Sequence, residues 1–368
     1  MEIKKQKFIS TFQISDFCFV IAFSAFCFPL SVFIMRLDRF ITLNLMQPLR
    51  RLRITHHEPR ITSLPILMYH SISDDPESGV SPYYSICTGL QRFREQMQWL
   101  KDNGYEGVTL SAGLAALEFT NQKQKIEIRN PKTEIGNSEY LPSAFSLQPS
   151  ALCPRPAALT FDDGFRDFYT HAFPILQQHG FSATMYLPTA FIGSERRSFK
   201  SRECLTWAET RELHRAGIEF GSHTVHHPEL VDLPWSGIRS EITDSKVQIE
   251  NQLAAPVKNF AYPYAFPQTR RDFVGRLKDL LMAGGYETCV TTQIGRHRTG
   301  ADPLEIKRLP VNSGDDDKLF QAKLAGGYDW LALPQTVIKK IKRHIPGSDK
   351  RNGDSAPCAR SGEPALDS

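Results

Sequence analysis

The sequence predicts an α/β fold, a closed (β/α)7 barrel with a hydrophobic helix at its N-terminus. Two observations predict the barrel. Apolar runs typical of buried strands alternate with amphipathic patterns typical of helices, several of which end in glycine. About seven such units follow one another, and this number favours a closed barrel of parallel strands over an open sheet. A third observation, an uncharged stretch near the start of the chain, predicts the additional helix.

The composition is that of one large domain with appendages. The chain has 368 residues, of which 41% are hydrophobic, enough for a full-sized core. Its 44 basic and 40 acidic residues leave a formal charge of +4, so no nucleic-acid partner is expected. The seven cysteines are scattered and contain no Cys-x-x-Cys pair. Neither a disulfide framework nor a thiolate metal cluster is therefore predicted.

Residues 1–36 are predicted to be a hydrophobic membrane anchor or an uncleaved signal. The 19 residues from Phe17 to Met35 carry no charge and are long enough for one helix to span a bilayer. Basic residues lie on both sides and no Ala-x-Ala cleavage pattern follows, so the side of the membrane stays open. We expect a membrane-associated protein of the cell envelope. The alternatives are a buried core helix and a start of translation at Met35.

The predicted domain covers residues 64–330 and follows a linker over residues 37–63. Its first strand, over residues 64–72, carries His70 near its end. The chain then alternates between helices and strands. Further strands are predicted over residues 105–110, 156–161, 182–187, 218–222, 257–262, 286–292 and 305–311.

The helices are recognised by apolar residues every three or four positions and by what terminates them. Residues 88–103, for example, carry Phe93, Met97 and Leu100 with charged residues between them, and Gly104 follows. Further helices are predicted over residues 112–119, 168–179, 206–216, 235–253, 270–283 and 316–324.

Three segments lie outside this alternation. The pattern disappears over residues 120–154, which indicates an exposed insertion that is either tolerated or shapes a substrate groove. Residues 331–345 predict a basic amphipathic helix, either solvated or lying on an anionic membrane surface. Residues 346–368 are rich in Gly, Ser, Pro and charge, which predicts a disordered tail.

Two adjacent carboxylates, Asp162 and Asp163, directly follow the strand predicted over residues 156–161. Barrel enzymes keep their active sites at this end of the strands. Two like charges beside a core are costly unless a cation lies near them. The alternative is a simple Asp-Asp-Gly turn.

A second polar stretch follows the strand predicted over residues 218–222. His223 and His227 are four residues apart, so both imidazoles can face one point from a helical turn or a tight loop. With a carboxylate from elsewhere they would form a three-ligand metal site that leaves a position for water. His226 is expected to point away from it.

The segments Thr160-Phe161-Asp162-Asp163-Gly164 and His223-Thr224-Val225-His226-His227-Pro228 resemble the T-F-D-D-G and H-[ST]-x-x-H-P motifs of the polysaccharide deacetylase family. This group is also called the NodB-homology family or carbohydrate esterase family 4. The resemblance implies a distorted barrel and hydrolysis of N-acetyl groups on amino-sugar polymers. The early Met68-Tyr69-His70 segment is similar to the branch that deacetylates poly-β-1,6-N-acetylglucosamine.

The same resemblance implies a role for each site residue. Asp162 would be the general base, and His70 would be the catalytic acid. Asp163, His223 and His227 would bind a divalent ion, with zinc expected and cobalt, manganese, nickel or iron as alternatives. The residues expected to contact the substrate are Tyr264, Pro263, Trp207 and Arg308. For the two aromatic residues among them, plain core packing is the alternative.

One departure from the family bears on catalysis. Many members have an arginine in an F-R-x-P-[YF] motif that steadies the base, and this chain has Ala261 there. Arg308 could replace that arginine from another strand. Ala265 also stands where the branch usually has glycine, which would narrow the loop.

The expected function is metal-dependent removal of acetyl groups from an amino-sugar polysaccharide: poly-N-acetylglucosamine, a chitin-like polymer or the peptidoglycan glycan. The expected partners are this N-acetylated glycan and a membrane. Hydrolysis of an O-acetyl ester or of another amide at the same metal is one alternative. The other is a catalytically silent envelope protein that binds glycan, although a binding module would not need an uncoordinated carboxylate beside a metal.

Overall fold

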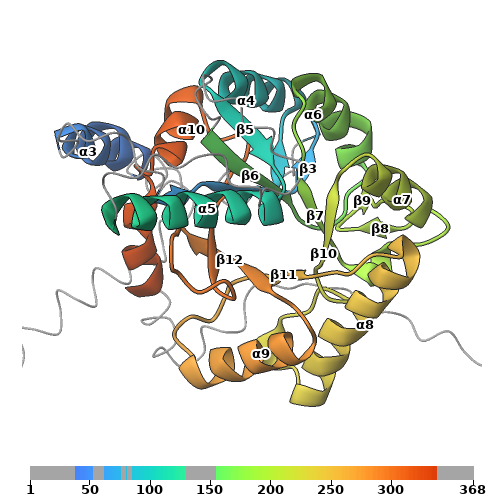
Figure 1. Cartoon of the computed structure of the whole chain (residues 1–368). Helices are drawn as coiled ribbons and strands as arrows, with labels where there is room; N and C mark the ends of the chain where they lie inside the picture. The colour runs from blue at the N-terminus through green and yellow to red at the C-terminus, as the bar shows by residue number, and fades with distance from the viewer. Residues whose placement is uncertain (1–37, 53–61, 76–79, 81–84, 130–154, 338–368) are drawn as a thin grey trace, which may run out of the picture.

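Parallel strands form a closed ring in the computed structural model, which describes residues 38–52, 62–75, 80, 85–129 and 155–337 (Figure 1). Among these residues the ring has seven strands, which confirms the predicted (β/α)7 barrel. In ring order the strands are β2 (Ile66–Tyr69), β6 (Arg155–Phe161), β7 (Thr184–Leu187), β10 (Glu219–Ser222), β11 (Asn259–Ala261), β12 (Thr288–Ile294) and β14 (Ile306–Pro310). Strand β14 pairs with β2, and β2 pairs with β6, which closes the ring. An additional strand, β5 (Tyr105–Val108), pairs in parallel with the first half of β6.

Helices surround the ring, as crossover connections between parallel strands require (Figure 1). The capping box of Thr206 and Glu209 starts α7, and Gly180 and Gly217 end two of the helices in the left-handed conformation. The helices are α4 (Leu90–Asp102), α5 (Leu110–Arg129), α6 (Phe173–His179), α7 (Trp207–Arg215), α8 (Trp235–Leu253), α9 (Arg271–Ala283) and α10 (Asp317–Leu324).

Apolar side chains fill the interior of the barrel below the site. Ala158, Tyr186, Ala261 and Ile306, from four different strands, belong to one buried cluster. Small residues make room for the large Tyr186 ring. Gly221 does so most directly, because a methyl group there would lie 2.5 Å from that ring.

The first predicted strand consists of three short pieces. β1 (Ser63–Leu64) pairs with β13 (His297–Arg298), β2 lies in the ring, and β3 (Ser71–Ile72) pairs with β4 (Cys87–Thr88). Because the chain changes neighbours twice, His70 falls between β2 and β3 rather than inside a strand.

The predicted insertion over residues 120–154 is wrong at its start. Helix α5 continues to Arg129 instead of ending at residue 119. The added segment lacks apolar periodicity, but its Gln, Lys and Glu residues are strong helix formers and no proline interrupts it before Pro131. Residues 130–154 lie outside the described part of the chain.

The predicted linker over residues 37–63 is also partly wrong, because residues 38–52 are helical and include η1 (Thr42–Met46) and α3 (Gln47–Leu52). Side chains from the other end of the domain hold this helix in place. Tyr328 donates a 2.6 Å hydrogen bond to Asp38, and Arg39 pairs with Asp316. Such partners, almost 300 residues away, leave no local sequence pattern.

Three predictions near the termini fall partly or wholly outside the described residues. The predicted anchor over residues 1–36 lies outside, as does the tail over residues 346–368. The predicted basic helix over residues 331–345 is helical from residue 332 to residue 337, where the described chain ends. Among the described residues, no helix is long and apolar enough to cross a membrane.

Candidate active site

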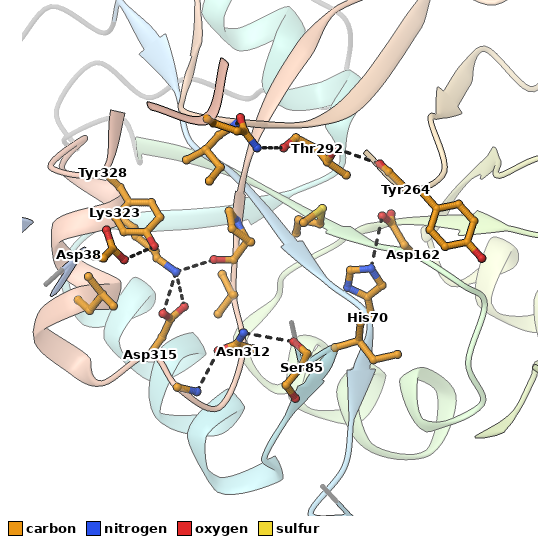
Figure 2. Close-up of a pocket in the computed structure, with 18 of the residues that line it drawn as sticks. Asp38, His70, Ser85, Asp162, Tyr264, Thr292, Asn312, Asp315, Lys323 and Tyr328 are labelled. Carbon is orange, nitrogen blue, oxygen red and sulfur yellow. Dashed lines mark hydrogen bonds and ion pairs between the residues drawn. The ribbon is translucent and has the colours of Figure 1, made fainter. Parts of the chain in front are cut away.

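The candidate site lies at the carboxyl ends of the barrel strands, where strand periodicity directs polar side chains inward. Ala158 faces the barrel interior, so Thr160 and Asp162, two and four residues later, face the same side. The same period takes the chain from Ile66 to His70, which lines the cavity beside Asp162 (Figure 2). His223 follows the end of β10 directly.

Asp163, His223 and His227 form a group that could hold a metal ion. Their ligand atoms lie within 4.8 Å of one another, and all three residues are buried. Oδ1 of Asp163 lies 3.3 Å from Nε2 of His227 and 3.7 Å from Nε2 of His223. This buried oxygen has no hydrogen-bond partner, although leaving such an acceptor unpaired is costly. The donor set therefore fits a divalent cation such as zinc.

Both imidazoles are prepared to act as ligands. Nδ1 of His223 donates to the backbone oxygen of Ala261 at 2.8 Å, which leaves Nε2 of that ring as the free nitrogen. Burial and the neighbouring His223 lower the pKa of His227 to about 2, so its ring is neutral, as metal binding requires. His226 points away, as expected, and pairs with Glu241 at 2.8 Å.

The backbone at the site is held in an unusual conformation. Asp163, Thr224, His227 and Tyr264 have φ between 54° and 70°, the left-handed region that non-glycine residues rarely adopt. Such strain persists where surrounding structure enforces it, and it is concentrated at functional sites. Gly164, which directly follows Asp163, continues the left-handed turn with φ of 62°.

Asp162 is held by Arg308 and does not belong to the group of three ligand residues. Nη1 and Nη2 of Arg308 donate to the two carboxylate oxygens at 2.7 Å each. Burial alone would raise the pKa of Asp162, but Arg308 and His223 hold it well below its ordinary value. The carboxylate is therefore charged at neutral pH.

His70 completes this part of the site. Its Nε2 lies 3.9 Å from Oδ2 of Asp162, and its side chain is 19% exposed toward the cavity. Burial lowers the pKa of His70, while Asp163 and Asp162 act in the opposite direction. The proposed acid and the proposed base are thus neighbours.

The four residues expected to contact the substrate have different locations. Tyr264 lines the cavity, is 45% exposed and packs edge to face with the His227 ring. Pro263 is buried beside it. Trp207 begins α7 and packs in the core at 8% exposure, so the prediction that it contacts substrate is wrong. Arg308 is fully buried and contacts the Asp162 carboxylate instead of the cavity.

One residue of the site was missed. Nζ of Lys200 lies 3.0 Å from Oδ2 of Asp163, and this lysine lines the cavity. It is at the turn between β8 (Ser198–Phe199) and β9 (Arg202–Glu203). No sequence signal pointed to it, because Lys-Ser is not among the residue pairs typical of tight hairpin turns.

The cavity has a volume of about 540 Å³, within the range of small-molecule sites. Figure 2 shows His70, Asp162 and Tyr264 on one side of it. Across from them is a second polar region, which includes the hydrogen bond from Tyr328 to Asp38 and a buried ion pair of Lys323 and Asp315. The N-terminal helical segment therefore forms part of the cavity wall.

Comparison with known proteins identifies the domain. The family model described as polysaccharide deacetylase matches residues 150–280, which contain both carboxylates and both histidines of the site. Residues 150–280 are therefore a polysaccharide deacetylase domain. This confirms the resemblance of the two motifs and supports a hydrolase of the deacetylase type.

Individual relatives extend this deacetylase likeness over most of the barrel. YxkH of Bacillus subtilis strain 168, which is named as a polysaccharide deacetylase, is 29% identical over 263 residues, covering 70% of this chain and 75% of that protein. The poly-beta-1,6-N-acetyl-D-glucosamine N-deacetylase of Staphylococcus aureus strain MSSA476 is 24% identical and covers 47% of this chain and 52% of that protein. The solved structure of the Streptococcus pyogenes deacetylase PplD in complex with acetate matches 71% of this chain and 98% of that chain, with a TM-score of 0.50 and 25% identity.

Proposed function

We propose that this protein is a metal-dependent deacetylase that hydrolyses N-acetyl groups of an amino-sugar polysaccharide to the free amine and acetate. One observation carries the proposal. The buried Oδ1 of Asp163 has no partner and faces two imidazole nitrogens, while the neighbouring Asp162 is held separately by Arg308. Such a site combines three cation ligands with a neighbouring carboxylate that is not a ligand and would act as the base.

Asp163, His223 and His227 would hold the ion. When bound, a divalent ion supplies Lewis-acid polarisation of the acetamide carbonyl and activation of a water. Zinc suits one carboxylate and two imidazoles, and cobalt, manganese, nickel or iron could replace it.

The remaining chemistry belongs to side chains of this chain. Asp162 would accept a proton from the water as the water oxygen attacks the acetyl carbon. Arg308 keeps that carboxylate charged and fixed before the reaction. His70, in its protonated form, would pass a proton to the amide nitrogen as the carbon–nitrogen bond breaks, so the amine leaves neutral. Tyr264, at the edge of the cavity, presents a ring face suited to a sugar.

A polymer of N-acetylglucosamine is the first substrate to test. The name of the S. aureus relative and the position of His70 beside Asp162 support it. Membrane attachment through residues 17–35 and a location in the cell envelope remain part of this proposal and call for a separate fractionation experiment.

The function is tested by acetate release from a panel of glycans, with and without a chelator. The panel contains poly-N-acetylglucosamine, chitin oligomers, peptidoglycan and acetylated xylan. We expect release from at least one N-acetylated glycan, loss of release with chelator, and recovery when zinc is added. Release from acetylated xylan alone would indicate an O-acetyl esterase. Glycan binding without any release would contradict the enzymatic proposal.

A further inference from the structure

Lys200 contacts the carboxylate of the candidate metal ligand Asp163 on one oxygen only. Its Nζ lies 3.0 Å from Oδ2, whereas Oδ1 is the unpartnered oxygen that faces the nitrogens of His223 and His227. The two oxygens of one buried carboxylate thus have different neighbours: a lysine ammonium on one, and two imidazoles on the other.

The hairpin that carries Lys200 is built to hold it there. Lys200 and Ser201 have φ of 50° and 61°, so both central residues of the turn are left-handed. Two-residue hairpin turns of this kind ordinarily use Asn or Gly at such positions. A lysine in this conformation is strained, and strain of this kind is retained chiefly where function requires the residue.

Aromatic packing fixes the hairpin against the site. The Phe199 ring stacks on Phe191 at 4.3 Å and lies 5.2 Å from the His227 ring. Nζ of Lys200 lies 4.8 Å from the Phe199 ring and 5.8 Å from the Tyr264 ring. The lysine therefore reaches Asp163 beside these two aromatic rings, with 33% of its side chain exposed.

A carboxylate beside a metal can coordinate through one oxygen or through both. Occupation of Oδ2 by an ammonium group leaves Oδ1 as the ligand and fixes the plane of the carboxylate. Groups that orient a metal ligand in this way commonly change metal affinity about 10- to 100-fold when they are removed.

We propose that Lys200 is a positioning residue that keeps Asp163 as a one-oxygen ligand directed between His223 and His227. This inference rests on the proposed metal-dependent function, and it assigns a role to a residue outside both family motifs. The opposite possibility is that the ammonium competes with the metal for the carboxylate. The two possibilities predict opposite effects on metal affinity. Loss of the lysine weakens metal binding if Lys200 positions Asp163, and strengthens it if the ammonium competes with the metal.

The test measures zinc affinity of the metal-free full chain by competition with a chromophoric chelator. Lys200→Asn removes the charge and retains a residue that tolerates the left-handed turn. We expect its zinc affinity to fall about 10- to 100-fold. Lys200→Arg should recover most of the loss. Lys258→Met, which breaks an exposed pair with Glu287, is the matched control and should bind like the wild type.

A spectroscopic measurement separates positioning from general damage. In cobalt-substituted protein, the visible absorption depends on the number of ligands, so Lys200→Asn should change its intensity and Lys258→Met should not. Thermal melts of the metal-free variants report folding independently. Equal or tighter zinc binding by Lys200→Asn would overturn the role of Lys200 and leave the deacetylase proposal intact. Zinc binding by the wild type no stronger than by His227→Ala would overturn the proposed function itself.

Discussion

Arg308 and Asp162 form a bidentate ion pair in the interior of the barrel, with both N–O distances at 2.7 Å. The residues are 146 positions apart in sequence and come from β14 and the end of β6. Arg308 also donates to the backbone oxygen of Thr291, which fixes its own orientation. It therefore contacts the proposed base directly in a chain that has Ala261 where many family members have arginine.

Removal of Arg308 should destabilise the protein strongly. Arg308→Met leaves the Asp162 carboxylate buried without a counter-charge, which typically costs about 3–5 kcal/mol of unfolding free energy. Urea unfolding of the metal-free protein measures this loss. The double variant Arg308→Met with Asp162→Asn should lose less than the sum of the two single variants, because no unpaired charge remains.

A surface ion pair provides the control for this experiment. Lys258→Met breaks a pair with Glu287 in which both side chains are more than 50% exposed. The resulting loss of unfolding free energy should stay below about 1 kcal/mol. If Arg308→Met were as mild as Lys258→Met, the buried pair would not be a stability determinant.

The same pair predicts a specific pH dependence. The pKa of Asp162 is lower in the folded protein than its ordinary value of 3.8, so the unfolded state binds more protons once the pH falls to that value. The stabilisation is therefore fully present above 3.8 and is lost as the pH falls toward the folded pKa. We expect the stability difference between wild type and Asp162→Asn to be constant from neutral pH to about pH 5 and to shrink below about pH 4. Urea unfolding in EDTA at several pH values measures it, and a difference that stays flat to pH 3 would contradict the assignment.

Substitution of the base and substitution of a ligand residue should have different effects on metal content. Asp162→Asn removes the proton acceptor but leaves the three ligands, so acetate release should fall at least about 10²- to 10⁴-fold while bound metal is retained. His227→Ala should lose both. Metal analysis and acetate release on the two purified variants check this. Undiminished release from Asp162→Asn would remove its assignment as the base.

Gly221 should be intolerant of a side chain although it lies in a regular strand. A methyl group there would lie 2.5 Å from the Tyr186 ring and 2.8 Å from the backbone oxygen of Asn259. Gly221→Ala should therefore lower the free energy of unfolding by about 1–3 kcal/mol. It should also weaken metal binding, because His223 is two residues away. Gly275→Ala in α9 is the matched control: among the described residues, no atom beyond the helix's own backbone and the neighbouring residues lies within 4 Å of the added methyl, and replacing a helical glycine should stabilise the protein by about 0.4–1 kcal/mol. Thermal melts and zinc competition compare the two variants.

Local sequence patterns were sufficient for much of the fold. Strand runs, helical periodicity and glycine terminators placed each strand of the ring and most helices within a few residues. The helical segment over residues 38–52 was missed although Ile41, Leu45 and Leu49 recur at helical spacing, and the extension of α5 to Arg129 was missed because it shows no apolar stripe in the sequence. The first depends on Tyr328 and Asp316, which the sequence does not place nearby.

Sequence by itself determined which residues form the candidate metal group, because Asp163, His223 and His227 follow directly from two short motifs at strand ends. Only the tertiary structure decided what surrounds them. Closure of the barrel brings Arg308 onto Asp162, a hairpin turn brings Lys200 onto Asp163, and core packing withdraws Trp207 from the cavity. The physical reason is that periodicity and motif spacing are properties of neighbouring residues, whereas charge pairing in a barrel joins side chains from distant strands and loops.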